Sequence, residues 1–320
     1  MNRADEPEQL CLFEGGPDVR KLRSEAARII GDASQSPNTR KAYASDWRDF
    51  ETWCDEAGRR PLPCSSDTLK LYAMDRLGVH KIATVERRLA AVVSKHEKAG
   101  LGSPYSLEVR ALMKGARRER GAGQLQKAAL RAEDLKRICV RLATTRGEVA
   151  ARDRAIIALG FSAATRRSEL VALKVADLDF VRKGLAITVR RSKTDQMQLG
   201  RVVGVFKASR RAYCAVEAVR DWLRIRGREP GFLFPGTGKS GHLTEASINL
   251  IIKRAVAMIG LDAKLYGAHS LRAGFVTAAA ESGVPESVIM QRTGHRSVQT
   301  VARYVRPASV FSVDALARAL

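Results

Sequence analysis

The chain has 320 residues, 45% of them hydrophobic, which excludes a disordered polypeptide and allows two domains that each bury a core. Lysine and arginine number 56 against 34 aspartate and glutamate residues, so the formal net charge is +22. Residues 1–36 carry a net charge of −2, and the remainder of the chain therefore carries +24. Such an excess favours a polyanionic partner, of which nucleic acid is the commonest.

Composition also argues against export, membrane insertion and metal binding. The five cysteines have no CxxC spacing and no histidine nearby, so we expect reduced thiols and no metal site. No apolar run approaches the roughly 18 residues of a membrane span. The acidic N-terminus lacks the apolar core of a signal peptide, and we expect a cytoplasmic protein.

The first half of the chain predicts a bundle of four short helices. Ser36 caps the first helix and Gly58 ends it. The second helix spans about residues 66–77, Thr84 caps the third, and the fourth covers residues 106–121. Four such helices make a compact bundle of about 100 residues. Apolar residues at helical spacing mark the buried faces, among them Trp47, Phe50, Leu69, Tyr72, Leu89 and Met113.

The fourth helix opens a strongly basic stretch. Residues 110–146 hold eleven basic residues against three acidic ones. We expect phosphate contacts from the side of this helix that lies opposite its apolar stripe, and from two arginines of the third helix. The expected DNA-binding residues are Arg87, Arg88, Lys114, Arg117 and Arg118. A solvated helix face is the alternative.

Beyond a glycine-containing linker the chain is again mostly helical, with one exception. Residues 185–206 alternate apolar and polar residues on both sides of a polar centre, which predicts a β-hairpin with Lys193 near the end of its first strand. A helix that stops at Gly283 follows, and Pro285 starts another. Ser297 caps a last helix, which contains Tyr304.

Five motifs in the second half lie on these predicted elements. They are ATRRSEL (164–170), RRSKTDQ (190–196), HSLRAGF (269–275), TGH (293–295) and RY (303–304). In this order they resemble the signature of the tyrosine recombinases, the phage integrase family that includes Cre. The resemblance extends from about residue 20 to 310. The family usually has a glycine two residues before the first arginine, where this chain has Ala164.

The resemblance implies a mainly α fold with a small β-hairpin or sheet. Residues 21–120 would form an N-terminal helical bundle, the SAM-like core-binding domain, after a flexible segment at 1–20. Residues 121–129 would be the linker, and 130–306 the mixed α/β catalytic domain. Residues 307–320 would form a tail helix that docks on a neighbouring protomer, although packing on its own domain is an equally good interpretation.

The family motifs also supply the expected site. The expected catalytic residues are Arg166, Lys193, His269, Arg272, His295 and Tyr304. The Ser-Glu-Leu register selects Arg166 over Arg167, and Glu169 would orient the catalytic groups.

The chemistry explains why these residue types must meet. Attack of a tyrosine on a DNA phosphodiester adds negative charge to the phosphate, and fixed arginines can stabilise that charge without a metal. Lys193 suits a general acid at the leaving 5′-oxygen, and His269 would assist proton transfer at the tyrosine. His295 would donate a hydrogen bond to the phosphate. The covalent 3′-phosphotyrosine keeps the bond energy, so we expect no cofactor.

Each residue alone has a simpler interpretation. Tyr304 could be an aromatic at a core edge, Arg166 and Glu169 a helix ion pair, and Lys193 a solvent contact. The occurrence of all five motifs together favours catalysis over these simpler interpretations.

We therefore expect a site-specific recombinase that cuts and rejoins double-stranded DNA through a Holliday junction, for integration, excision or resolution of a mobile element or plasmid. The expected partners are a specific recombination site, three further copies of the chain in a tetramer on two sites, and an accessory DNA-binding protein, with no membrane. A type IB topoisomerase and a noncatalytic DNA-binding regulator of this fold are the alternatives.

Overall fold

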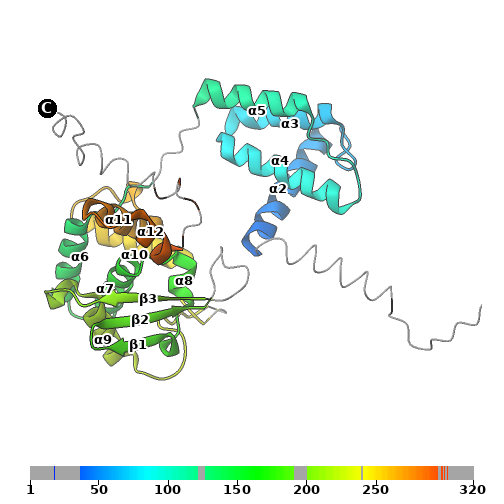
Figure 1. The fold of residues 1–320 in the computed structure, drawn as a ribbon. Coiled ribbons are helices and arrows are strands. Elements are labelled where there is room, and N and C mark those ends of the chain that lie inside the picture. The colour runs from blue at the N-terminus through cyan, green and yellow to red at the C-terminus, as the bar shows by residue number, and fades with distance from the viewer. Residues whose placement is uncertain are drawn as a thin grey trace, which may run out of the picture. The chain divides into compact units, whose positions relative to one another are not determined.

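The computed structural model describes the following parts of the chain: residues 18, 37–121, 127–190, 200–238, 241–294, 297, 299 and 301. The chain divides into two compact units, Met1–Gln124 and Leu125–Leu320 (Figure 1). Within the described residues, no helix has the length and apolar character needed to cross a membrane. Each unit has its own hydrophobic core. The domain ranges predicted above, 21–120 and 130–306, stay predictions.

The first unit is a helical bundle within residues 37–121. Its helices are α2 (Pro37–Glu56), α3 (Ser66–Val79), α4 (Ile82–Lys98) and α5 (Leu107–Arg120). Serine side chains cap two of them: Ser65 accepts from the amide of Thr68 at 3.1 Å, and Ser106 from the amide of Val109 at 3.4 Å. The predicted apolar stripes meet in one core, and its largest buried side chains are Phe50, Leu69, Tyr72, Leu89 and Met113.

The start of α4 differs from the prediction. Thr84 is not the cap, because the helix begins at Ile82 after an extended Lys81 whose side chain makes no capping bond. The amide of Thr84 donates to the carbonyl of Lys81 at 2.9 Å, which places Thr84 inside the first turn. A threonine at a plausible cap position therefore misled the prediction by three residues.

The second unit combines a small antiparallel sheet with a larger group of helices (Figure 1). Its α-helices are α6 (Ala132–Thr144), α7 (Glu148–Ser162), α8 (Arg167–Ala172), α9 (Ala215–Arg226), α10 (Glu245–Ala257), α11 (Ala268–Glu281) and α12 (Glu286–Thr293). Short 3₁₀ turns are η2 (Val175–Asp177), η3 (Arg211–Tyr213) and η4 (Ala263–Leu265). The strands are β1 (Leu178–Val181), β2 (Gly184–Val189) and β3 (Arg201–Phe206).

The predicted hairpin is confirmed as β2 and β3, which pair from Gly184–Phe206 to Val189–Arg201. The sequence prediction missed β1, which pairs with β2 over four residues. Four residues are too few for alternation to stand out from a helical background. The predicted fold class, mainly α with a small sheet, matches this architecture.

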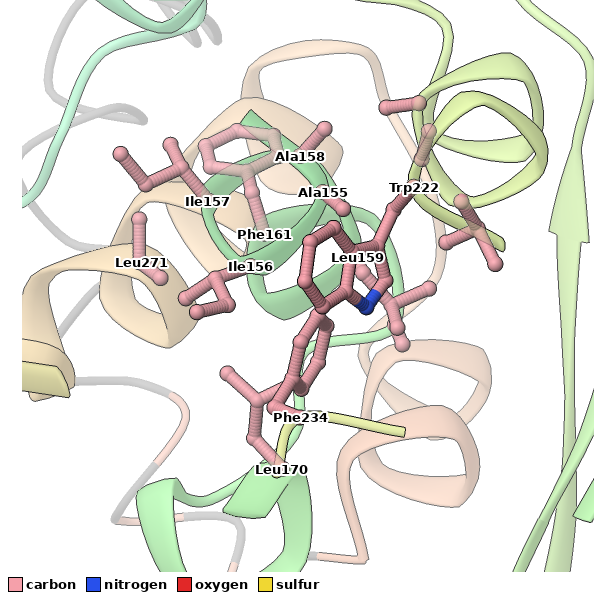
Figure 2. Close-up of a cluster of buried hydrophobic side chains, with 14 of the residues drawn as sticks. Ala155, Ile156, Ile157, Ala158, Leu159, Phe161, Leu170, Trp222, Phe234 and Leu271 are labelled. Atoms are coloured by element: carbon pink, nitrogen blue, oxygen red, sulfur yellow. The ribbon is translucent and has the colours of Figure 1, made fainter. Parts of the chain in front are cut away.

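Helix α7 runs through the middle of the second core. Figure 2 shows its buried side chains gathered with Trp222, Phe234 and Leu170 from other segments. The Trp222 indole donates to the carbonyl of Leu233 at 2.8 Å, so its one polar group is satisfied inside the core. This core supports the turn that follows α7 and leads into α8.

The segment that enters the second unit is bound to α11. The amide of Leu130 donates to the carbonyl of Ser270 at 3.0 Å, and the amide of Ala128 to that of Leu265 at 2.9 Å. A Cβ on Gly274 would lie 2.0 Å from the Leu130 carbonyl oxygen, so only glycine permits this approach. The position of α11 is therefore fixed by a direct backbone contact.

Candidate active site

The turn before α8 has an unusual backbone. Ala164 has a φ of +49°, and no other non-glycine residue in the described parts of the chain has a positive φ. Its carbonyl accepts a hydrogen bond from Arg272 Nη1 at 2.8 Å, so a buried arginine of α11 holds the turn in place. Left-handed backbone is the conformation that glycine adopts most easily, which accounts for the glycine usual at this position in the resembling family.

Arg166 follows this turn and stands at the N-terminus of α8. Glu169 Oε2 accepts from the Arg166 backbone amide at 2.9 Å, and Glu169 Oε1 accepts from Arg166 Nη1 at 2.7 Å. One carboxylate therefore caps the helix and also orients the guanidinium. Arg167, the neighbour that the register excluded, instead pairs with Glu245 at 2.5 Å and is half-exposed.

Glu169 binds a second arginine, which comes from β3. Arg201 Nη2 lies 2.8 Å from Glu169 Oε2, and Arg201 Nη1 lies 3.3 Å from Oε1. Burial opposes ionisation of Glu169, but the hydrogen bonds and charges of Arg201 and Arg166 outweigh it and hold its pKa below the usual value. Glu169 is therefore a carboxylate at neutral pH.

Two of the predicted residues lie on α11, three positions apart. Arg272 is 3% exposed, whereas the His269 residue is exposed. Partial desolvation and the positive charges of Arg272 and Arg166 hold the pKa of His269 below its ordinary value. The imidazole is therefore neutral at pH 7 and able to accept a proton.

The end of α12 also reaches this group. Gly294 has a φ of +67° and ends the helix, and its carbonyl accepts from Arg166 Nη2 at 3.3 Å. Three of the predicted residues lie outside the described part of the chain, namely Lys193, His295 and Tyr304. The structure thus pairs Arg166 with Glu169, bonds Arg272 to the turn two residues before Arg166, and places His269 within range of the charges of both arginines.

Sequence reasoning missed Arg201. Its position follows the alternation of β3, in which Arg201 shares the inward side of the strand with Val203 and Val205. A charged residue in the inward phase of an apolar strand needs a buried partner, and that was the available signal.

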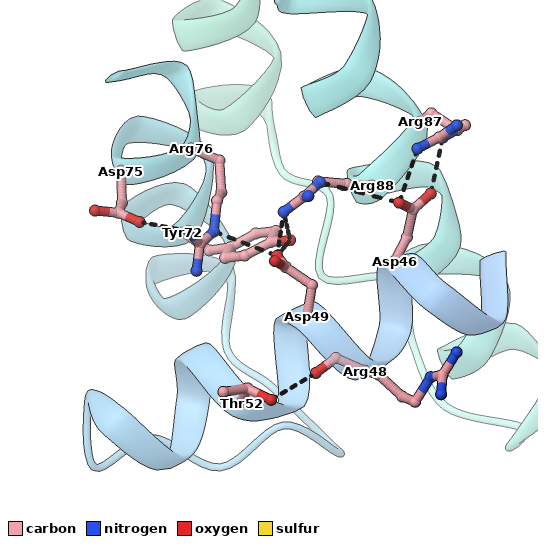
Figure 3. A network of polar contacts seen from close by, with 9 residues as sticks. All are labelled: Asp46, Arg48, Asp49, Thr52, Tyr72, Asp75, Arg76, Arg87 and Arg88. Carbon is pink, nitrogen blue, oxygen red and sulfur yellow. Dashed lines mark hydrogen bonds and ion pairs between the residues drawn. The ribbon is translucent and has the colours of Figure 1, made fainter. Parts of the chain in front are cut away.

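The predicted DNA-contact arginines of α4 differ in their surroundings (Figure 3). Arg88 is only 13% exposed and binds Asp49, which also accepts from the Tyr72 hydroxyl at 2.7 Å and pairs with Arg76 at 3.3 Å. Arg87 is 50% exposed, and its Nε and Nη2 donate to Asp46 at 2.9 and 3.0 Å. Arg88 lies within the bundle, and Arg87 presents its guanidinium at the surface.

Two further basic surfaces lie on the first unit. Lys114, Arg117 and Arg118 are exposed on α5, and Arg117 Nε donates to Glu86 at 2.6 Å. Between α2 and α4 lies a groove of about 420 Å³ in which Lys95 Nζ stands 5.4 Å from the Trp47 ring centre. The residues that line it are Arg40, Tyr43, Ala44, Trp47, Arg48, Ala91, Ser94, Lys95 and Lys98.

Comparison with known proteins settles the family. The phage integrase family model matches residues 128–309, and the chain is 36% identical over 307 residues to the "Integrase/recombinase xerD homolog" of Selenomonas ruminantium, covering 93% of this chain and 89% of the relative. The chain belongs to the phage integrase family. A tyrosine recombinase XerD of Bradyrhizobium diazoefficiens is 25% identical over 86% of this chain and 88% of its own.

Two solved structures of DNA-bound integrases share the fold. An integrase of transposon Tn1549, in complex with transposon right end DNA, superposes with a TM-score of 0.65 at 17% identity and covers 93% of this chain and 96% of its own. A lambda integrase dimer bound to a core site gives a TM-score of 0.60 at 16% identity, covering 90% and 95%. The predicted family, fold class and tyrosine recombinase type are confirmed.

Proposed function

We propose that this chain cuts and rejoins duplex DNA at specific sites through a covalent intermediate on Tyr304. The observation that carries the proposal is the fixed position of Arg166. Glu169 and the Gly294 carbonyl hold its guanidinium, and the preceding turn is bonded to Arg272. Two arginines held in this way suit the nonbridging oxygens of one phosphate, because their charge and donor geometry are set before the substrate arrives.

The proposed cleavage step transfers one phosphoryl group. The Tyr304 oxygen attacks phosphorus, the bond from phosphorus to the 5′-oxygen breaks, and a 3′-phosphotyrosine forms. His269 accepts the tyrosine proton, and Lys193 gives a proton to the leaving 5′-oxygen. Arg166, Arg272 and His295 stabilise the charge on the phosphate.

Rejoining reverses the same steps. A 5′-hydroxyl from the partner site attacks the phosphotyrosine, which releases Tyr304 and joins the exchanged strands. Two successive exchanges pass through a Holliday junction, and the bond energy is kept throughout, so no cofactor is needed.

The predicted core-binding domain, residues 21–120, is proposed to bind the duplex. The predicted catalytic domain, residues 130–306, would then cleave and rejoin the strands. The exposed cations of the first unit suit phosphate contacts, and Lys114, Arg117 and Arg118 form one such surface. Arg87 suits a more specific role, because Asp46 fixes its plane and leaves its outer edge exposed. A fixed arginine edge can bind the O6 and N7 atoms of guanine. Arg88 would support the bundle beneath it.

The proposed assembly is a tetramer on two DNA sites in the cytoplasm, with an accessory DNA-binding protein at some sites. The tail at 307–320 would link neighbouring protomers. Truncation after Pro307 should then leave one-site binding intact and abolish two-site complexes on a native gel. Normal two-site complexes would remove the tail from the proposal.

Tyr304→Phe tests the cleavage step. The binding site is first selected from random duplexes with the wild-type protein, and the selected duplex is then nicked so that cleaved strands are trapped. Wild type should form adducts that survive denaturing gels, also in excess EDTA, because no metal takes part. The phenylalanine variant should bind this DNA equally well and form no adduct.

The same assays separate the alternatives. Adducts on the phenylalanine variant would show that another residue is the nucleophile. Relaxation of supercoiled DNA that lacks the selected site would favour a topoisomerase. Site-specific binding by wild type without any adduct would favour a noncatalytic regulator.

A further inference from the structure

Arg201 lies at the end of the β2–β3 pairing, and the proposed general acid, Lys193, stands between these two strands in the sequence. Arg201 is the first residue of β3 and pairs with Val189 at the end of β2. Its side chain is 18% exposed and lies on the inward side of the sheet. An arginine in this position connects the hairpin to whatever its guanidinium contacts.

The contact is the carboxylate of Glu169, whose side chain is 1% exposed. Two nitrogens of Arg201 face the two oxygens of Glu169 at 2.8 and 3.3 Å. Arg166 binds the same carboxylate through its side chain at 2.7 Å. Glu169 therefore stands between two arginines that come from distant parts of the sequence.

The charge balance gives this arrangement a consequence. A buried carboxylate needs a cation, and a single arginine beside it forms a neutral pair. If Arg166 were the only partner of Glu169, its charge would be largely cancelled before any phosphate arrived. With Arg201 present, the group of Arg166, Glu169 and Arg201 keeps a net charge of +1.

Arg201 also lies against the end of α12. A Cβ built on Gly294 would stand 3.3 Å from Arg201 Nη1, and the Gly294 carbonyl accepts from Arg166 Nη2 at 3.3 Å. The Arg201 guanidinium therefore lies where the base of the hairpin, the N-terminus of α8 and the end of α12 meet.

We propose that Arg201 is a positioning residue that binds Glu169 and thereby keeps the charge of Arg166 available to the scissile phosphate. This inference rests on the proposed function. Arg201 needs no contact with DNA for this role, because it acts entirely through Glu169.

The test is a double-mutant cycle of Arg201→Gln and Glu169→Gln, measured as the rate of adduct formation on the nicked site. Arg201→Gln should slow adduct formation by about 10²-fold, the scale of a misplaced catalytic group, with unchanged DNA affinity. Adding Glu169→Gln to it should raise the rate again by about tenfold or more, since no carboxylate then neutralises Arg166. If Arg201 had a purely structural role, adding Glu169→Gln would instead lower the rate further, because the double variant would lose a second stabilising contact.

Arg211→Gln is the matched control. Arg211 pairs with Glu217 at 2.6 Å and also binds Asp221, and neither carboxylate belongs to the proposed site. Its removal should leave the rate of adduct formation unchanged. A normal rate for Arg201→Gln, or a double variant as slow as that single variant, would overturn the inference.

Two further arms keep the test decisive. If the Arg201→Gln variant does not fold, the rate of adduct formation by Glu169→Gln is compared with that of the double variant. The double variant has glutamine at position 169, so it contains no carboxylate that has lost its arginine. These two rates should agree within about threefold, and a difference above tenfold would overturn the inference. Failure of the proposed function looks different, because Tyr304→Phe would then still form adducts or wild type would form none.

Discussion

Arginine–carboxylate networks occur in both units, and the network around Glu169 joins different kinds of segment from the network around Asp46 and Asp49. In the first unit Asp46 and Asp49 both lie on α2 and bind arginines of α3 and α4, so each pair links two helices of the bundle. In the second unit Glu169 caps its own helix and binds Arg166, three residues before it, and Arg201 from a strand.

The two networks therefore stabilise different properties of the protein. Pairs that link helices contribute to packing, and their loss should cost stability. Pairs that converge at the ends of α8, β3 and α12 fix the location of positive charge, and their loss should cost rate.

Removal of a phosphate-binding arginine should have the largest effect. Arg166→Ala or Arg272→Ala should slow adduct formation by about 10³-fold or more, the scale found for arginines that stabilise phosphoryl transfer. DNA affinity at the selected site should fall far less than the rate. Single-turnover cleavage on the nicked duplex measures the rate, and near-normal cleavage by either variant would place the phosphate elsewhere.

Neutralising Lys114, Arg117 and Arg118 together should affect binding to all sequences. Each phosphate contact contributes about 0.9 to the slope of log affinity against log salt, so the slope should flatten by roughly 2.7. Titrations of specific and random duplexes between 50 and 200 mM salt measure this. An unchanged slope would identify the α5 surface as a solvated helix face.

The neighbours Arg87 and Arg88 should behave differently when changed. Arg88→Ala removes a partner of Asp49 inside the bundle and should lower the free energy of unfolding by roughly 1–3 kcal/mol. Arg87→Gln removes both hydrogen bonds to the buried Asp46 carboxylate, so it should also lower the free energy of unfolding, and it alone should alter the base preferred at one position of the selected site. Urea unfolding and repeated site selection test the pair, and an altered base preference in Arg88→Ala but not in Arg87→Gln would assign the base contact to Arg88.

The smallest effect concerns pH. Because the pKa of His269 lies below its ordinary value of about 6.5, the neutral imidazole is the main form from pH 7 upward. Adduct formation should therefore be flat from pH 7 to 8 and fall only as the pH drops through the lowered pKa. His269→Gln should be slower and should lack that fall, and a retained fall would assign it to another group.

Much of this architecture could be predicted because local patterns were strong. Helical spacing of apolar residues located α2, α3 and α5, and alternation located β2 and β3. The Ser-Glu-Leu register separated Arg166 from Arg167, which the structure places in different contacts.

The remainder depended on tertiary contacts that no local pattern contains. The role of Arg201 requires that the base of the hairpin lies beside α8, and these segments are 32 residues apart. Arg87 and Arg88 are adjacent in sequence, and only the carboxylates of α2 decide which one turns inward. The alanine at 164 does not itself predict a left-handed backbone, because alanine rarely adopts it, and the glycine usual at this position in the family was the available signal.

The contact between Leu130 and α11 has a mechanical consequence. The chain enters the second unit through backbone hydrogen bonds from Ala128 and Leu130, and the second of these ends on the helix that carries His269 and Arg272. Gly274 lets the two backbones touch without an intervening side chain. A displacement of the backbone at Leu130 would therefore act directly on α11, because no side chain lies between the two backbones.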